Sequence, residues 1–139
     1  MQARDALNYD YSVAKCFTYA AILFGIVGML IGVVIAYQMA FPELNYLAGE
    51  YGTFGRLRPL HTSGVIFGFL LSGIFATWYY IGQRVLKVSM AESPFLMIIG
   101  KLHFWLYMIL MVIAVVTLFM GIGTSKEYAE LEWPLDILV

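Results

Sequence analysis

The stretch Phe54-Gly-Arg-Leu-Arg-Pro-Leu-His-Thr-Ser-Gly-Val-Ile-Phe-Gly-Phe69 places two arginines and a proline at the start of a long apolar segment. Proline suits the first helical position, where its missing N–H would have no partner in any case, so we expect a helix beginning at Pro59. His61 then lies on the first turn. Gly64 and Gly68 fall within about 60° of it, because successive residues are about 100° apart. The stretch predicts a helix with a histidine and two glycines on one face.

That face has the composition that a membrane haem site requires of one helix. An imidazole inside the membrane is costly unless it is paired or coordinates a metal. Arg56 and Arg58 lie just outside the apolar run, where their guanidinium groups would meet haem propionates. Gly64 and Gly68 would let a porphyrin plane approach the backbone. The alternative is that His61 reaches the headgroup region and that the glycines serve helix packing.

The composition indicates a chain embedded in lipid. Of its 139 residues, 62% are hydrophobic and only 12% are charged, which excludes a soluble globular domain. A formal net charge of −1 without a basic cluster argues against a nucleic-acid partner. Cys16 is the only cysteine, so an internal disulfide and a cysteine-based zinc or iron–sulfur site are excluded. We therefore expect an all-α membrane protein.

Three uncharged segments are long enough to cross a bilayer, for which about 20 residues are needed. They predict transmembrane helices over residues 16–41, 59–83 and 102–125. Small residues recur along the first helix at the spacing that lets another helix approach closely. This small-residue stripe consists of Ala21, Gly25, Gly28, Gly32 and Ala36.

The carboxy-terminal segment is acidic. Residues 126–136 contain Glu127, Glu130, Glu132 and Asp136. Carboxylates beside haem propionates would need a cation between them, and calcium favours oxygen ligands, so a calcium site is one hypothesis and a solvated helix cap is the other. A fourth helix would begin where the chain stops at Val139. We therefore expect residues 1–139 to be the amino-terminal part of a single membrane domain in a longer protein.

The distribution of charges predicts the orientation of the chain. The amino-terminal lead and the second loop share one side and carry five cations: Arg4, Lys15, Arg84, Lys87 and Lys101. The other side carries only Arg56, Arg58 and Lys126 among six acidic residues. The positive-inside rule therefore predicts a cytoplasmic amino terminus, with His61 and the acidic segment near the outer surface.

His103 is the only other histidine. With three helices it lies near the cytoplasmic side, roughly 20 to 30 Å from His61 along the membrane normal, so the two cannot bind the same iron. We interpret His103 as an interfacial side chain beside Lys101 and Trp105. The methionines of the third helix are interpreted as packing residues rather than copper ligands.

Three motifs carry a resemblance to a known family. Phe54-Gly-Arg-Leu-Arg-Pro-Leu-His-Thr62 resembles the start of the second transmembrane helix in the catalytic subunit of cbb3-type cytochrome c oxidases, the C family of haem-copper oxidases. Phe41-Pro-Glu-Leu-Asn45 and Thr124-Ser-Lys-Glu-Tyr-Ala-Glu-Leu-Glu-Trp-Pro134 are similar to the segments after the first and third helices of that subunit. The similarity runs over nearly the whole chain.

The resemblance implies that His61 is an axial ligand of the low-spin haem b. It also implies that Glu127 matches a residue that binds calcium near a propionate and the partner subunit. Glu130 lies three residues further on and would share its face of a helical turn, as a second calcium ligand or a propionate contact.

For the complete subunit the resemblance implies a high-spin haem b and copper, bound by later helices, and oxygen reduction coupled to proton pumping. It implies c-type cytochrome subunits, the remainder of subunit I and membrane lipid as partners, in the bacterial inner membrane. A nitric-oxide reductase large subunit and a transporter or channel fragment without haem are the alternatives.

Overall fold

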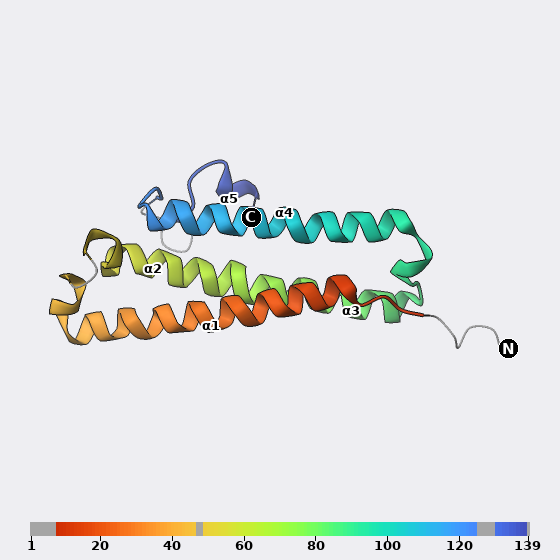
Figure 1. Cartoon of the computed structure of the whole chain (residues 1–139), viewed down its shortest axis with the longest axis horizontal. Helices are drawn as coiled ribbons and strands as arrows, with labels where there is room; N and C mark the ends of the chain where they lie inside the picture. Colours follow the sequence, from red (N-terminus) through yellow and green to blue (C-terminus); the bar gives the residue numbers. More distant parts are fainter. Residues whose placement is uncertain (1–7, 47–48, 125–129, 139) are drawn as a thin grey trace.

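The described part of the chain contains three long helices. The computed structural model describes residues 8–46, 49–124 and 130–138. α1 (Ser12–Ala40), a continuous helix from Phe54 to Leu86 and α4 (Pro94–Phe119) run alongside one another in alternating directions (Figure 1). Each is long and apolar enough to cross a membrane. The chain is therefore an all-α, multi-pass membrane protein.

The middle helix has three parts, namely α2 (Phe54–Ser63), the π-helical segment η3 (Gly64–Leu71) and α3 (Ser72–Leu86). Short 3₁₀ turns η1 (Pro42–Tyr46), η2 (Gly49–Gly52) and η4 (Met90–Glu92) lie in the two connections. A single helical turn, α5 (Leu135–Leu138), begins where the sequence predicts a fourth helix to open.

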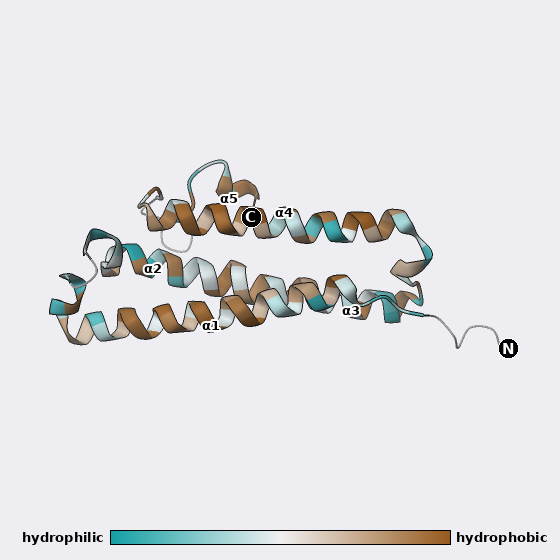
Figure 2. Cartoon of the chain, in the orientation of Figure 1, coloured by the Kyte–Doolittle hydropathy of each residue, from teal (hydrophilic) through white to brown (hydrophobic). Residues whose placement is uncertain are grey.

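The surface of the three helices is largely apolar. Figure 2 shows hydrophobic residues along α1 and α4, whereas hydrophilic residues gather in the connections and at helix ends. Leu23, Leu30 and Ile109 are among the large hydrophobic side chains that remain exposed. A helix that is apolar on all sides is typical of a membrane span, because lipid replaces the protein partner that such a surface would otherwise need.

The middle helix begins at Phe54, so the prediction that it begins at Pro59 is wrong. Thr53 has an extended backbone, and the side-chain oxygen of Asn45 accepts a hydrogen bond of 2.8 Å from the Phe54 N–H. This bond satisfies one of the amides that a helix start leaves without a partner, so the helix begins five residues earlier than predicted. Pro59 consequently lies inside the helix.

The other predicted boundaries also shift. α1 begins at Ser12 rather than residue 16, and α4 runs from Pro94 to Phe119 rather than over 102–125. Pro94 takes the first helical position after Ser93, whose hydroxyl accepts from the Leu96 N–H. The predictions followed uncharged runs, whereas a helix end can include a charged residue such as Lys101 whose long side chain reaches water.

Two clusters of buried side chains hold the helices together. One surrounds Phe17 and Met111 at the end where the amino terminus lies. The other joins Leu60 of α2 to Leu118 of α4 and to Leu131 beyond it. The second cluster therefore fixes the segment after α4 against the start of the middle helix.

Candidate functional site

His61 packs against α1. Its Nδ1 lies 2.8 Å from the backbone carbonyl oxygen of Gly28. A Cβ atom on Gly32 would come within 2.7 Å of the His61 Cε1 atom. Both positions belong to the small-residue stripe, which therefore receives the imidazole as well as a neighbouring helix. Sequence reasoning missed this contact because a backbone carbonyl leaves no signal in the residue types.

The contact with Gly28 fixes the chemistry of the ring. A carbonyl oxygen only accepts hydrogen bonds, so His61 Nδ1 carries the proton and donates. In the neutral imidazole Nε2 is then unprotonated and has a lone pair for a metal ion. Metal-binding histidines are commonly oriented in this way, by a hydrogen bond from the other ring nitrogen to a carbonyl. The arrangement fits an axial haem ligand.

Gly64 and Gly68 also face α1. A Cβ atom on Gly68 would lie 2.7 Å from Cγ of Phe24, and one on Gly64 would lie 3.9 Å from the Gly28 Cα. These glycines therefore bring the middle helix close to α1. In the structure their open side is filled by α1, as the helix-packing alternative describes.

An apolar cavity lies beside this contact. It has a volume of about 330 Å³ and is enclosed by side chains of α1, the middle helix and α4. Leu60 and Gly64, which stand on either side of His61 in the sequence, both line it, together with Val112 of α4. The cavity is almost free of polar groups, so the Gly28 side of the contact lies in an apolar environment.

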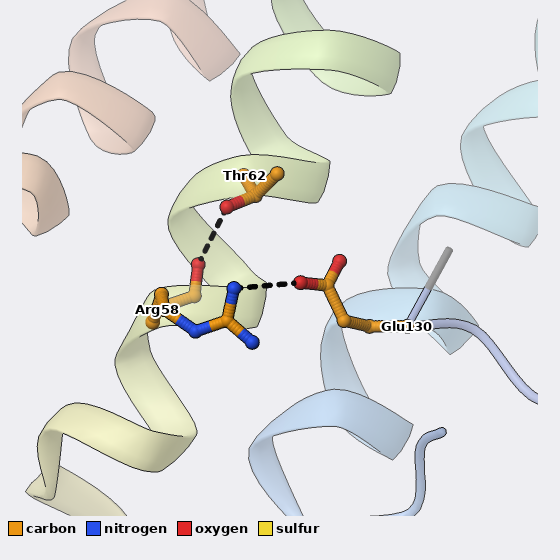
Figure 3. Close-up of polar contacts among 3 residues, drawn as sticks. All are labelled: Arg58, Thr62 and Glu130. Atoms are coloured by element: carbon orange, nitrogen blue, oxygen red, sulfur yellow. Dashed lines mark hydrogen bonds and ion pairs between the residues drawn. The ribbon is translucent and has the colours of Figure 1, made fainter. Parts of the chain in front are cut away.

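The two arginines diverge. Arg56 donates from Nη1 to the carbonyl oxygen of Phe119 at 3.1 Å and lies over the ring of Tyr51. Arg58 Nη1 lies 3.2 Å from Oε1 of Glu130, as Figure 3 shows. The sequence predicts a common role at propionates, but in the structure each arginine already has its own protein partner.

Glu130 is almost completely buried, with 2% of its side chain exposed, whereas Arg58 is 34% exposed. The Arg58 carbonyl accepts from the Thr62 hydroxyl at 3.0 Å, which holds the local turn (Figure 3). Glu130 Oε1 is within ion-pair distance but has no hydrogen bond among the described residues. The pairing is therefore electrostatic and leaves an acceptor on Glu130 unsatisfied.

The other acidic residue of the calcium hypothesis, Glu127, lies outside the described residues. Within residues 8–46, 49–124 and 130–138, no group of three or more histidine, cysteine, aspartate or glutamate side chains could hold a metal ion. The described part of the chain thus contributes Glu130 alone to that hypothesis.

His103 occupies a separate environment among aromatic rings, and its interpretation as an interfacial side chain stays a prediction. Its ring packs against Phe17 and Phe75, and its Nδ1 is hydrogen-bonded to the Tyr79 hydroxyl at 3.0 Å. The helix begins earlier than predicted, so His103 lies well inside it. His61 contacts α1 at Gly28, 11 residues beyond Phe17, or about 17 Å along the helix, so the two histidines serve different sites.

Comparison with known proteins gives consistent matches. The family described as cytochrome C and quinol oxidase polypeptide I matches residues 12–139. The cbb3-type cytochrome c oxidase subunit CcoN1 of Stutzerimonas stutzeri is 42% identical over 139 residues, which cover 100% of this chain and 28% of the relative. Cytochrome c oxidase subunit 1 of Rhodobacter capsulatus is 42% identical over 95% of this chain and 24% of its own length. The chain spans about a quarter of the length of these relatives.

Proposed function

Because the chain belongs to the cytochrome c and quinol oxidase polypeptide I family, we propose that it is part of the catalytic subunit of a cbb3-type terminal oxidase, in which His61 is an axial ligand of the low-spin haem b. The complete subunit would reduce oxygen to water and pump protons, with a high-spin haem b and copper held by the rest of the chain. Electrons would arrive from c-type cytochrome subunits.

The observation that carries this proposal is the hydrogen bond from His61 Nδ1 to the Gly28 carbonyl. It selects the tautomer whose Nε2 can bind iron, and it holds the ring plane in one orientation. It also raises the electron density on Nε2, which is one way in which a protein tunes the potential of a haem. A bound haem would supply one-electron transfer. Gly28 is therefore a positioning residue, acting through its backbone.

Arg58 is the better placed of the two arginines for a propionate. It precedes His61 by three residues, which puts it about 60° away around the helix and one turn nearer the end. Arg56 is about 140° away and is held by the Phe119 carbonyl. We propose that Arg58 is the principal propionate contact and that Glu130 orients its guanidinium group. Arg56 would stabilise the propionates by its positive charge from a greater distance.

Calcium belongs to the same proposal. Glu127 and Glu130 would supply oxygen ligands near the propionates. Oε1 of Glu130, which has no hydrogen bond, would be the ligand atom of that residue. Arg58 competes for that oxygen, so calcium binding would require the ion pair to loosen. The outer position of these residues follows from the proposed cytoplasmic amino terminus in the bacterial inner membrane.

The relatives named as cytochrome c oxidase subunits favour an oxidase over a nitric-oxide reductase. The family match gives no support to a transporter or channel fragment without haem.

The test is the haem content of the complete complex carrying His61→Ala, measured by pyridine haemochrome analysis and reduced-minus-oxidised spectra. We expect loss of the low-spin haem b band with the high-spin haem retained. His103→Ala is the matched control, since it removes the other histidine of this chain and should leave the band in place. A His61→Ala complex with full low-spin haem content would overturn the assignment.

A further inference from the structure

A groove lies between α1 and α3 at the end where the amino terminus lies. Its volume is about 400 Å³. The lining includes Tyr11, Lys15, Thr18, Ala76, Thr77 and Tyr80. The haem site described above uses none of these residues. The groove therefore calls for a separate explanation.

The floor of the groove is apolar and lies at the depth of the membrane interface. Ala14 and Ala76 line it and are buried, so its floor consists of small apolar side chains. Tyr80, which lines the groove, and Trp78, two residues earlier on α3, are both exposed. Tryptophan and tyrosine gather where the hydrocarbon core meets the headgroups. A lipid chain could therefore lie on the floor while its headgroup reaches the rim.

The rim carries hydrogen-bond donors. Arg84 donates from Nε to the Tyr11 hydroxyl at 3.1 Å, and its guanidinium carbon lies 5.2 Å from the ring centre of Tyr80. The Tyr11 hydroxyl accepts that bond, so its own proton is available to another acceptor. The ammonium group of Lys15 is exposed. Stacking on the rings thus holds Arg84 in place while its two terminal nitrogens remain available.

These cations have no acidic partner at close range in the described part of the chain, where the one ion pair joins Arg58 to Glu130. Among the described residues, Asp10 interacts electrostatically with Lys101 and, more weakly, with Lys15. The hydroxyl and the backbone N–H of Ser12 both donate hydrogen bonds to the Asp10 carboxylate, and the N–H bond is 2.7 Å long. These bonds lower the pKa of Asp10, so its carboxylate is ionised and already has hydrogen-bond partners. Lys15 and Arg84 thus retain most of their capacity for an anion.

We infer that this groove binds the headgroup of an anionic phospholipid, with Lys15 and Arg84 contacting its phosphate. Charge complementarity and the apolar floor select this occupant. A zwitterionic lipid would bring its own ammonium group against the two cations, and a free anion would leave the floor uncovered. Basic pockets between transmembrane helices are a general means of recognising such headgroups. The inference requires only that the helices span a membrane, and it is independent of the haem proposal.

The test uses the complete oxidase complex in phosphatidylcholine nanodiscs. Phosphatidylglycerol and phosphatidylcholine carrying the same photoreactive acyl chain are added in separate samples, and cross-linked peptides are identified by mass spectrometry. We expect the phosphatidylglycerol probe to label the α1 and α3 peptides that line the groove several-fold more than the phosphatidylcholine probe. Lys15→Gln and Arg84→Gln should each lower that preference about fivefold.

The matched control is Lys87→Asn, which removes a cation from the same end but outside the groove. Asparagine tolerates the left-handed backbone of Lys87, whose φ is 52°. This variant should keep the preference, and unchanged haem spectra in all three variants show that the complexes are assembled. Equal labelling by the two probes, or an unchanged preference in both glutamine variants, would refute the inference. Competition by inorganic phosphate as strong as that by unlabelled phosphatidylglycerol would also refute it, because the site would then be selective for a free anion.

Discussion

At the scale of single residues, two glycines of α1 determine what His61 can do. Gly28 provides the carbonyl that accepts from Nδ1, and Gly32 provides the space in which the ring lies. Any side chain at position 32 would meet the imidazole edge. The orientation of the proposed ligand is thus set by α1, a helix that contributes no side chain to the contact.

Gly32→Ala should therefore disturb the haem without removing its ligand. The added methyl would lie 2.7 Å from Cε1 and 3.0 Å from Nδ1 of His61, so the ring must move or the helices must separate. We expect a shifted low-spin haem band or a partial loss of that haem, with helix content unchanged by circular dichroism. Gly73→Ala, where a Cβ atom meets nothing within 4 Å, is the control. Identical spectra for both variants would contradict this account.

The Arg58–Glu130 pair joins the middle helix to the segment after α4. Removing Arg58 leaves a nearly buried carboxylate without its partner, whereas Glu130→Gln removes the charge and nearly keeps the shape. Arg58→Ala should lower the free energy of unfolding by about 1–3 kcal/mol, less than for a fully buried pair because Arg58 is partly exposed.

Glu130→Gln should cost less than Arg58→Ala, about 1 kcal/mol. Thermal or denaturant unfolding of the assembled complex measures both. Glu132→Gln, a neighbouring exposed site, is the control and should change stability by no more than about 0.5 kcal/mol. If Arg58→Ala lowers the free energy of unfolding no more than Glu132→Gln does, the buried Glu130 carboxylate does not depend on Arg58 as proposed.

At the scale of elements, the unusual feature is the π-helical segment η3, which directly follows the turn that carries His61. π-helical turns are rare and often occur at functional sites. Tyr107 of α4 donates a hydrogen bond of 2.6 Å to the Phe67 carbonyl within η3. The segment is thus held from two sides, by this hydroxyl and by the close contact of Gly68 with Phe24.

The contact of Gly68 with Phe24 predicts a compensating pair of substitutions. Gly68→Ala would place a Cβ atom within 2.7 Å of Cγ of Phe24 and should destabilise the complex by about 1–3 kcal/mol through overpacking. In a Phe24→Ala background the same substitution should cost less, because Cγ and Cδ1 of Phe24, two of the three atoms that clash, are then absent. Unfolding midpoints of the single and double variants measure the coupling. Gly82→Ala, at an open position, serves as the control, and purely additive effects would exclude the proposed contact.

At the scale of the whole molecule, three spans place the two connections on opposite sides of a membrane. Glu50 lies in η2 of the first connection and Glu92 in η4 of the second, and both are exposed. Glu50→Cys should react with an impermeant maleimide in intact cells, whereas Glu92→Cys should react only after permeabilisation. Both variants are made in a Cys16→Ser background and read by mass spectrometry of the labelled peptides. The reverse pattern would show that the proposed cytoplasmic amino terminus is wrong.

Much of this architecture is predictable from the sequence, because a segment can cross a membrane when its uncharged apolar run is long enough. Three apolar runs predict three spans, and the spacing of Gly25, Gly28 and Gly32 predicts close approach of a neighbouring helix. Helix boundaries were predicted less well. The middle helix begins at Phe54 because of a bond from its amide to Asn45, nine residues away, and no local pattern contains that contact.

The sequence by itself determined that the chain is helical and lipid-embedded, since these properties follow from the count and spacing of apolar and charged residues. It also supplied His61, Arg58 and Glu130 as candidates. Only the tertiary structure decided that Glu130 pairs with Arg58, that His103 lies in an aromatic cluster, and that the Gly28 carbonyl selects the His61 tautomer. The physical reason is that these contacts depend on which helix faces which, and in the last case on a backbone atom that every residue type shares.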